Sequence, residues 1–234
     1  MFGSKTGMIL PLLILLSVAC NRHDSTHKSF TLKERMDTVS YIMGYDYGKT
    51  IREEGITPVV EAMIQGLNDG LNDTCQLSDS ARNRLIDSFN KELEKKKERE
   101  RQEIIRKNRT QAEEFFDSLH KDKEIQCTST GLCYKILKQG DGPSPAASDS
   151  VTIHYRAMLT DETLIDMSYD TGPVSFRVKE VLPGLSEGIR LMKKGSIYEF
   201  YIPPDLAYGD QAYGKIIPPG AALIYVVELI EINQ

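Results

Sequence analysis

Residues 202–223 read IPPDLAYGDQAYGKIIPPGAAL, and this segment decides how the C-terminal half of the chain is interpreted. Its prolines and glycines are typical of a loop, because proline cannot donate to a strand ladder. The segment nevertheless carries two Ala-Tyr-Gly copies five residues apart and the apolar pair Ile216 and Ile217. Loops run over the surface and are usually polar. Two tyrosines and two isoleucines in one loop therefore predict the wall of a binding pocket.

The residues around this loop alternate between strand and turn patterns. Apolar and polar side chains alternate along 151–158 and 198–202, which is typical of half-buried strands. One stretch, 185–192, is helix-like. These patterns predict an α+β domain over residues 125–234, in which an antiparallel sheet wraps one short helix. The expected strands are Leu132–Lys138, Ser150–Leu159, Val174–Val178, Ile197–Ile202 and Ala222–Ile232.

Residues 31–77 are predicted to form an all-α domain. Thr31 followed by Glu34 matches a capping box that would start the first helix. Thr57 and Pro58 match the N-cap and first position of a second helix. The N-terminal half is therefore expected to be helical, in contrast to the C-terminal half.

This helical domain also shows signs of pairing with another copy. Gly44 and Gly48 lie four residues apart, and each costs a helix about 1 kcal/mol relative to alanine. Such a pair suggests close approach of another backbone, although a simple helix end at Gly48 is an alternative. An amphipathic stripe follows at Val60, Met63, Ile64, Leu67 and Leu71. Because so short a helical region cannot bury both of its faces alone, we predict a homodimer.

Residues 78–120 predict one long connecting helix. It would begin at Ser78 or Asp79 and run to about Leu119. Its middle, residues 95–103, reads KKKERERQE and has no apolar side chain. Because acids are interleaved with the bases, a solvated helix is favoured over a nucleic-acid or lipid-binding site. At 1.5 Å per residue such a helix is an arm of roughly 60 Å, which we interpret as a spacer.

The first residues resemble a targeting segment. Lys5, an apolar run over 8–18 and small residues before Cys20 resemble a bacterial lipoprotein signal. We therefore predict a signal peptide over 1–19, lipidation at Cys20 and a flexible tether over 20–30. A plain secretory signal that happens to contain a cysteine is the alternative. The predicted location is the bacterial cell envelope, lipid-anchored on the periplasmic side of the outer membrane.

Composition argues against several classes of function. The net charge of −5 gives no electrostatic reason to expect nucleic-acid binding. The sequence has no Gly-rich phosphate loop, no nucleophile elbow and no histidine cluster with metal-ligand spacing. We therefore expect neither a cofactor nor a metal ion, and the residues alone indicate only that the C-terminal domain binds something apolar.

Cys127 and Cys133 flank the turn-like segment TSTGL. A hairpin there would place the two cysteines opposite each other, so a disulfide is one possibility. Two small, half-buried thiols are the other.

Several motifs in the C-terminal half resemble those of FKBP-type peptidyl-prolyl cis-trans isomerases. They are VTIHY (151–155), LID (164–166), VLPGLSEGIRLMKKG (181–195), IPPDLAYG (202–209), IIPPGAAL (216–223) and VVELIEI (226–232). The helical half, with SYIMGYDYGKTI (40–51) and VVEAMIQGLNDGL (59–71), resembles the dimerising N-terminal domain of the periplasmic, macrophage-infectivity-potentiator-like members.

The resemblance implies roles for individual residues. It places the catalytic groups at Tyr155, Asp166 and Tyr208. Tyr208 matches the tyrosine that hydrogen-bonds a ligand carbonyl, so it is favoured over Tyr213. An alternative to the catalytic role of Asp166 is a structural pairing with Tyr155 at a sheet edge. For Phe176 and Ile217, the alternative to substrate binding is ordinary core packing. The substrate-binding residues implied are Ile165, Val174, Phe176, Val181, Leu182, Leu185, Tyr213, Ile216, Ile217 and Tyr225.

The chain departs from the family pattern at four pocket positions. Ile165, Val174 and Leu185 stand where the family prefers Phe, Phe and Trp, and Tyr225 stands where Phe is usual. Since an aromatic ring contributes about 150–250 Å² of buried surface, we predict a smaller apolar wall and reduced activity.

The implied function is isomerisation of X–Pro bonds, which assists the folding of exported proteins. A dry, apolar pocket disfavours the polar planar amide and therefore favours the twisted transition state. The implied partners are unfolded or proline-containing exported polypeptides. The alternatives are a non-catalytic periplasmic chaperone with a degraded prolyl pocket, and a structural lipoprotein that uses the domain to hold one partner.

Overall fold

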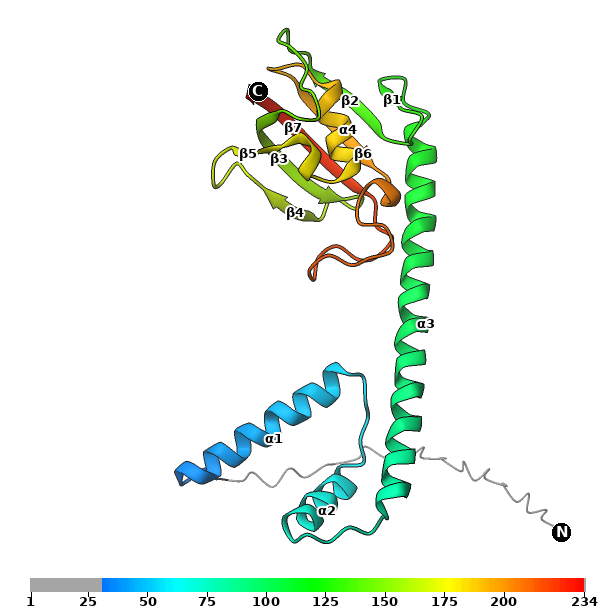
Figure 1. Ribbon diagram of the computed structural model, residues 1–234, viewed down its shortest axis with the longest axis vertical. Coiled ribbons are helices and arrows are strands. Elements are labelled where there is room, and N and C mark those ends of the chain that lie inside the picture. The colour runs from blue at the N-terminus through cyan, green and yellow to red at the C-terminus, as the bar shows by residue number, and fades with distance from the viewer. Residues whose placement is uncertain (1–30, 234) are drawn as a thin grey trace, which may run out of the picture. The chain divides into compact units, whose positions relative to one another are not determined.

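The computed structural model describes residues 31–233 (Figure 1). The predicted signal peptide, the lipidation at Cys20 and the tether lie outside the described residues. The chain forms two compact units, the first ending at Gln76 and the second beginning at Leu77. Within residues 31–233, no helix combines the length and the apolar character needed to cross a bilayer.

The first unit contains α1 (Arg35–Glu53) and α2 (Val60–Leu71). Helix α1 begins later than predicted, because the capping box pairs Glu34 with Asp37 and not Thr31 with Glu34. The Asp37 carboxylate accepts a hydrogen bond from the backbone N–H of Glu34 at 3.1 Å, so Glu34 itself becomes the N-cap. The predicted start at Thr31 is therefore wrong.

The predicted start of α2 is also wrong. Thr57 and Pro58 precede the helix, and the N-cap is Val59, with φ −84° and ψ 104°. A β-branched residue favours this extended conformation, which delays the first helical turn. Neither α1 nor α2 has a buried residue, so the predicted apolar stripe, including Ile64 and Leu67, is exposed.

The second unit begins with α3 (Asp79–Leu119), whose 41 residues confirm the predicted long helix. The Ser78 hydroxyl accepts a hydrogen bond from the backbone N–H of Ala81 and so caps the first turn. Most of the helix is solvated. Its buried residues are Ile105, Ala112 and Leu119, which lie seven apart and therefore on one face.

A seven-stranded antiparallel sheet forms the body of the second unit (Figure 1). The strands run in the order β1-β2-β6-β7-β3-β4, and β5 pairs with β3. Between them lie the 3₁₀ turns η1 (Val178–Glu180) and η2 (Pro204–Leu206) and the helix α4 (Pro183–Leu191). The strands are β1 (Ile125–Cys127), β2 (Cys133–Lys138), β3 (Ser150–Leu159), β4 (Leu164–Met167), β5 (Val174–Arg177), β6 (Ile197–Ile202) and β7 (Leu223–Asn233).

The two faces of the sheet are covered by different helices. Alternate strand residues such as Phe200 pack on one face with Leu185 and Ile189 of α4. Gly188 permits this contact, because a Cβ there would lie 2.6 Å from the Phe200 ring. On the opposite face, Tyr201 and its neighbours pack against the last turns of α3, including Leu119. The sheet therefore joins the arm helix to the helix that supports the pocket.

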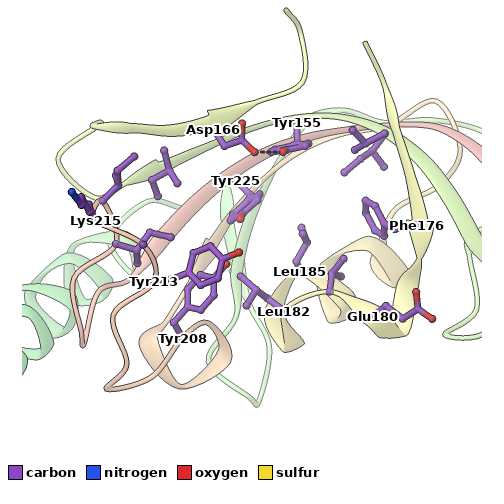
Figure 2. Close-up of a pocket in the computed structure, with 17 residues that line it drawn as sticks. Tyr155, Asp166, Phe176, Glu180, Leu182, Leu185, Tyr208, Tyr213, Lys215 and Tyr225 are labelled. Atoms are coloured by element: carbon purple, nitrogen blue, oxygen red, sulfur yellow. Dashed lines mark hydrogen bonds between the residues drawn. The ribbon is translucent and has the colours of Figure 1, made fainter. Parts of the chain in front are cut away.

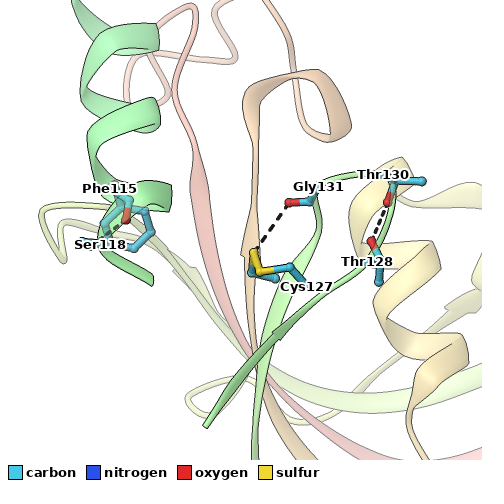
Figure 3. Close-up of a disulfide and its surroundings, with 7 residues drawn as sticks. Phe115, Ser118, Cys127, Thr128, Thr130 and Gly131 are labelled. Atoms are coloured by element: carbon cyan, nitrogen blue, oxygen red, sulfur yellow. Dashed lines mark hydrogen bonds between the residues drawn. A yellow bond between two sulfur atoms is a disulfide. The ribbon is translucent and has the colours of Figure 1, made fainter. Parts of the chain in front are cut away.

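The α+β class and the sheet wrapped on one helix were correctly predicted, but the strand count was not. Five strands were expected, and β1 and β4 were missed because the three residues of β1 are too few to show a period and LIDM of β4 does not alternate between apolar and polar side chains. Strand β1 pairs with β2 so that Cys127 faces Cys133, and the two form a disulfide (Figure 3). The disulfide alternative is therefore confirmed, and Cys75 is exposed and unpaired.

Candidate active site

A cavity of about 640 Å³ opens between the sheet, α4 and the 205–220 segment (Figure 2). All thirteen residues that the sequence assigned to a site line this one cavity. Four lining residues were missed: Ile153, Glu180, Gly214 and Lys215. Each of the four could have been predicted from the sequence. Ile153 shares a strand face with Tyr155 two residues on, and the other three are neighbours of assigned residues.

Strands β3 and β7 and the helix α4 form the base of the cavity. Tyr155 of β3 and Tyr225 of β7 stack with their ring centroids 6.1 Å apart. Leu185, in the first turn of α4, is only 6% exposed and belongs to the buried core. Val181 and Leu182 lie in the link between η1 and α4 and pack against the same core. The base is therefore part of the rigid core rather than a mobile surface.

One polar pair sits in this apolar setting. The Tyr155 hydroxyl donates a hydrogen bond to the carboxylate of Asp166, which projects from β4 at the end of the sheet (Figure 2). The second carboxylate oxygen accepts from the backbone N–H of Met167 at 2.8 Å. Burial, followed by the bond to Asp166, raises the pKa of Tyr155 to about 12. Tyr155 therefore remains a protonated donor at neutral pH.

The loop after β6 supplies the opposite wall. Gly209 and Gly214 both have φ +60°, a conformation that other residues rarely adopt, and they let the chain turn twice. Tyr213 and Ile217 exchange backbone hydrogen bonds of 3.0 and 3.3 Å, which close the tip. Ile217 is 4% exposed and confirms that this loop has a buried apolar side.

Tyr208 lies at the start of the same loop and packs against the core. Burial is the main cause that raises its pKa, so its hydroxyl also stays protonated. Among the described residues this hydroxyl has no hydrogen-bond partner, and it lies in the cavity wall. A protonated, unsatisfied hydroxyl in an apolar cavity is available to donate to a bound ligand.

Two charged side chains border the cavity. Glu180 and Lys215 are exposed and lie at opposite ends in Figure 2. Metal-ligand types gather elsewhere in residues 31–233, where ligand atoms of His120, Cys127 and Cys133 lie within 4.8 Å of one another. Both sulfur atoms of that group are already joined to each other in the disulfide.

This fold and cavity define a class of domain in which an antiparallel sheet wraps one helix and an apolar cavity lies between them. Two family models match the chain. One is described as FKBP-type peptidyl-prolyl cis-trans isomerase and matches residues 142–230. The other is the domain amino-terminal to FKBP-type peptidyl-prolyl isomerase and matches residues 36–136.

Relatives match along nearly the whole chain. Peptidyl-prolyl cis-trans isomerase Mip of Coxiella burnetii is 32% identical over 229 residues, covering 97% of this chain and 98% of the relative. Outer membrane protein MIP of Legionella longbeachae is 31% identical, with 94% of each chain covered. The crystal structure of FkpA from Escherichia coli has a TM-score of 0.69 and 29% identity, covering 87% of this chain and 99% of that one.

The chain therefore belongs to the FKBP-type peptidyl-prolyl cis-trans isomerases, and it is an enzyme of that kind. Its helical half and arm carry the family's amino-terminal domain, as the resemblance in the sequence implied.

Proposed function

We propose that the cavity beneath residues 205–220 is where the enzyme isomerises X–Pro bonds of exported, incompletely folded proteins. The observation that supports this most directly is the convergence on one apolar cavity of the thirteen side chains that the family resemblance implied. The cavity has a donor at Tyr208 and a polar pair, Tyr155 and Asp166, on the other side.

The mechanism requires only non-covalent interactions. The barrier to rotation is about 20 kcal/mol because resonance gives the amide bond partial double-bond character. The planar amide is more polar than the twisted one, so an apolar cavity destabilises the ground state relative to the transition state. Tyr208 donates a hydrogen bond to a substrate carbonyl and orients the chain. Because slow X–Pro isomerisation limits folding, the enzyme accelerates the folding of its clients.

Asp166 has a narrower part in this proposal. Its carboxylate accepts from Tyr155 and so fixes the position of that ring in the cavity wall. The structural role and the catalytic role are compatible, because a correctly placed Tyr155 ring is itself part of the apolar site.

A second proposal concerns assembly and location. Large apolar side chains of the first unit are exposed, among them Met43, Tyr47 and Leu67. A single copy leaves them in water, so we propose a homodimer through α1 and α2, as in the family's amino-terminal domain. A lipid anchor at Cys20 in the bacterial envelope is part of the same proposal, supported by a relative named as an outer membrane protein.

The exposed apolar surface also supports the rival function, a chaperone that holds unfolded clients without catalysis. A prolyl-peptide isomerisation assay on the whole chain separates the two. We expect acceleration that Asp166→Ala and Tyr208→Phe both reduce. Asp170→Ala and Tyr169→Phe are matched controls, because both residues are exposed and lie outside the cavity. No acceleration, with aggregation of a client still suppressed, would favour the chaperone.

A further inference from the structure

One face of the arm helix α3 holds the loop that carries Tyr208. The face consists of side chains spaced three and four residues apart, so they lie on the same side of the helix. It contacts both limbs of the 205–220 loop, which lies beside α3 in Figure 1. The residues of this face are Arg101, Ile105, Asn108, Arg109 and Ala112.

Arg109 makes the closest connection to the first limb. Its guanidinium donates to both carboxylate oxygens of Asp205, at 2.8 and 3.4 Å, and Nε donates to Asp210 at 2.7 Å. Asp205 lies three residues before Tyr208 and Asp210 lies two residues after it. One side chain of the arm therefore binds the carboxylates of residues on both sides of the proposed catalytic tyrosine.

The second limb is held by neighbours of Arg109 on the same face. Asn108 donates to the carbonyl of Pro219 at 2.8 Å. Gly220 comes so close to the helix that a Cβ there would lie 3.0 Å from the carbonyl oxygen of Ile105. Gly220 in turn donates to the carbonyl of Gly209 at 2.8 Å, which ties the two limbs together. Both ends of the loop are thus fixed to α3.

The contact between Arg109 and the loop joins one positive charge to two negative charges. The Arg109 side chain is 34% exposed, whereas Asp205 and Asp210 are 75% and 46% exposed, so solvent reaches both ion pairs and their value here is geometric. The guanidinium holds the pKa of Asp205 below its usual value through their hydrogen bond. The planar guanidinium of Arg109 makes two hydrogen bonds to Asp205 and a third to Asp210. This geometry fixes the orientation of both carboxylates, which the ammonium group of a lysine would not do.

Packing against the core and stacking on Tyr213 hold the ring of Tyr208. Its hydroxyl has no partner among the described residues, so no hydrogen bond of its own fixes where it points. We propose that Arg109 is a positioning residue for the isomerase reaction, which holds the Tyr208 hydroxyl where it meets the substrate carbonyl. This inference rests on the proposed role of Tyr208. It makes the arm helix part of the catalytic unit rather than only a spacer.

The test is a double-mutant cycle on the whole chain, with isomerisation of a short prolyl peptide as the readout. We expect Arg109→Gln to lower kcat/KM about three- to fivefold, and by no more than Tyr208→Phe does, because the loss passes through the hydroxyl of that tyrosine. In a Tyr208→Phe background the same change should cost less than about twofold, because its effect passes through that tyrosine. Arg109→Lys should fall between wild type and Arg109→Gln.

Arg106→Gln is the matched control. Arg106 lies on the same helix and pairs with Glu103 of that helix, so its loss should leave kcat/KM unchanged. If Arg109→Gln does not fold, Asp210→Ala removes the bond from Arg109 Nε on the loop side and takes the place of Arg109→Gln in the cycle. Circular dichroism of each variant establishes that it is folded before the rates are compared.

Three results would overturn the proposal, and they are distinguishable. Wild-type activity of Arg109→Gln beside an impaired Tyr208→Phe would remove the role of Arg109 and leave the proposed function standing. If the loss of kcat/KM in the double variant equals the product of the losses in the two single variants, Arg109 acts independently of Tyr208, as a merely structural contact does. Wild-type activity of Tyr208→Phe itself would remove the proposed site, and the role of Arg109 with it.

Discussion

The ring of Tyr213 stacks on the ring of Tyr208, with 4.6 Å between the centroids and 18° between the planes. The two tyrosines of the repeated Ala-Tyr-Gly sequence therefore have different surroundings. Tyr208 packs against the core, whereas Tyr213 is 60% exposed and covers its partner from the loop tip. Their hydroxyl groups are thus expected to contribute unequally to catalysis.

Tyr208→Phe keeps the stacked ring and removes only the hydroxyl. We expect kcat/KM for a prolyl peptide to fall about three- to tenfold, because one neutral hydrogen bond contributes roughly 0.5–1.5 kcal/mol. Tyr213→Phe should change it less than about twofold. A protease-free isomerisation assay measures both, and equal losses in the two variants would contradict the assignment of the carbonyl donor to Tyr208.

The sequence was most informative where patterns are long. Strands β3 and β6 and the end of α3 lie where predicted, because ten alternating residues or forty helical ones carry a clear period. The helix starts were less predictable, since Thr31 with Glu34 and Glu34 with Asp37 have the same three-residue spacing and only the folded backbone decides between the two pairs.

The lining of the pocket was predictable for a different reason. Its residues come from recognisable motifs, so their grouping follows once the family is recognised. The contact between Arg109 and Asp205 was not predictable. These residues are 96 apart in the chain, and on sequence alone Arg109 is one base among many on a solvated helix. Long-range ion pairs leave no period or motif in the sequence.

Tyr155→Phe is predicted to change how stability depends on alkaline pH. The folded state raises the pKa of Tyr155 from 10.0 to about 12, so it binds this proton more tightly than the unfolded state. The resulting stabilisation is complete below pH 10.0 and is lost as pH rises toward about 12. The variant should therefore lose less stability over that interval than wild type, as measured by urea unfolding at several pH values.

Other tyrosines titrate in the same interval, so the informative quantity is the difference between the two proteins. Tyr169→Phe serves as the control, because that side chain is exposed and outside the pocket. An identical pH dependence in wild type and Tyr155→Phe would contradict the raised pKa of Tyr155, which burial and then the bond to Asp166 produce.

Ile165→Phe tests whether the small apolar wall limits the enzyme. Ile165 is half-buried on β4 and lines the cavity, so a ring there enlarges the apolar surface that meets the substrate. We expect kcat/KM to rise about two- to fivefold. Leu164→Phe is the matched control, because the adjacent side chain is 46% exposed and does not line the cavity. A fall in rate would show that the wall is already complete.

Removal of the disulfide should lower stability and leave the pocket intact. Cys127 and Cys133 are six residues apart, so the constraint on the unfolded chain is worth about 2 kcal/mol in the loop-entropy model. Neither cysteine lines the cavity. We therefore expect Cys127→Ala with Cys133→Ala to reduce the free energy of unfolding by that amount, measured by urea denaturation. Cys75→Ser should have no effect, and an equal loss there would refute the explanation.

Leu67→Asp is predicted to dissociate the homodimer. Leu67 is 66% exposed on α2, within the stripe that has no buried partner in a single copy. In the proposed dimer a carboxylate at this position would be buried without a counter-charge, which is unfavourable. We expect the dimer dissociation constant to rise on the order of hundredfold, as measured by sedimentation equilibrium.

Ala62→Asp adds the same charge to the opposite side of α2 and should leave the dimer intact. Leu67→Asp should also isomerise a short prolyl peptide at the wild-type rate per copy, because the cavity lies wholly within the second unit. It should suppress client aggregation less well, since that task depends on extended surface from both copies. A monomer that retains full chaperone activity would contradict the proposal that client holding requires the dimer, and a loss of peptide isomerisation would show that the first unit contributes to catalysis.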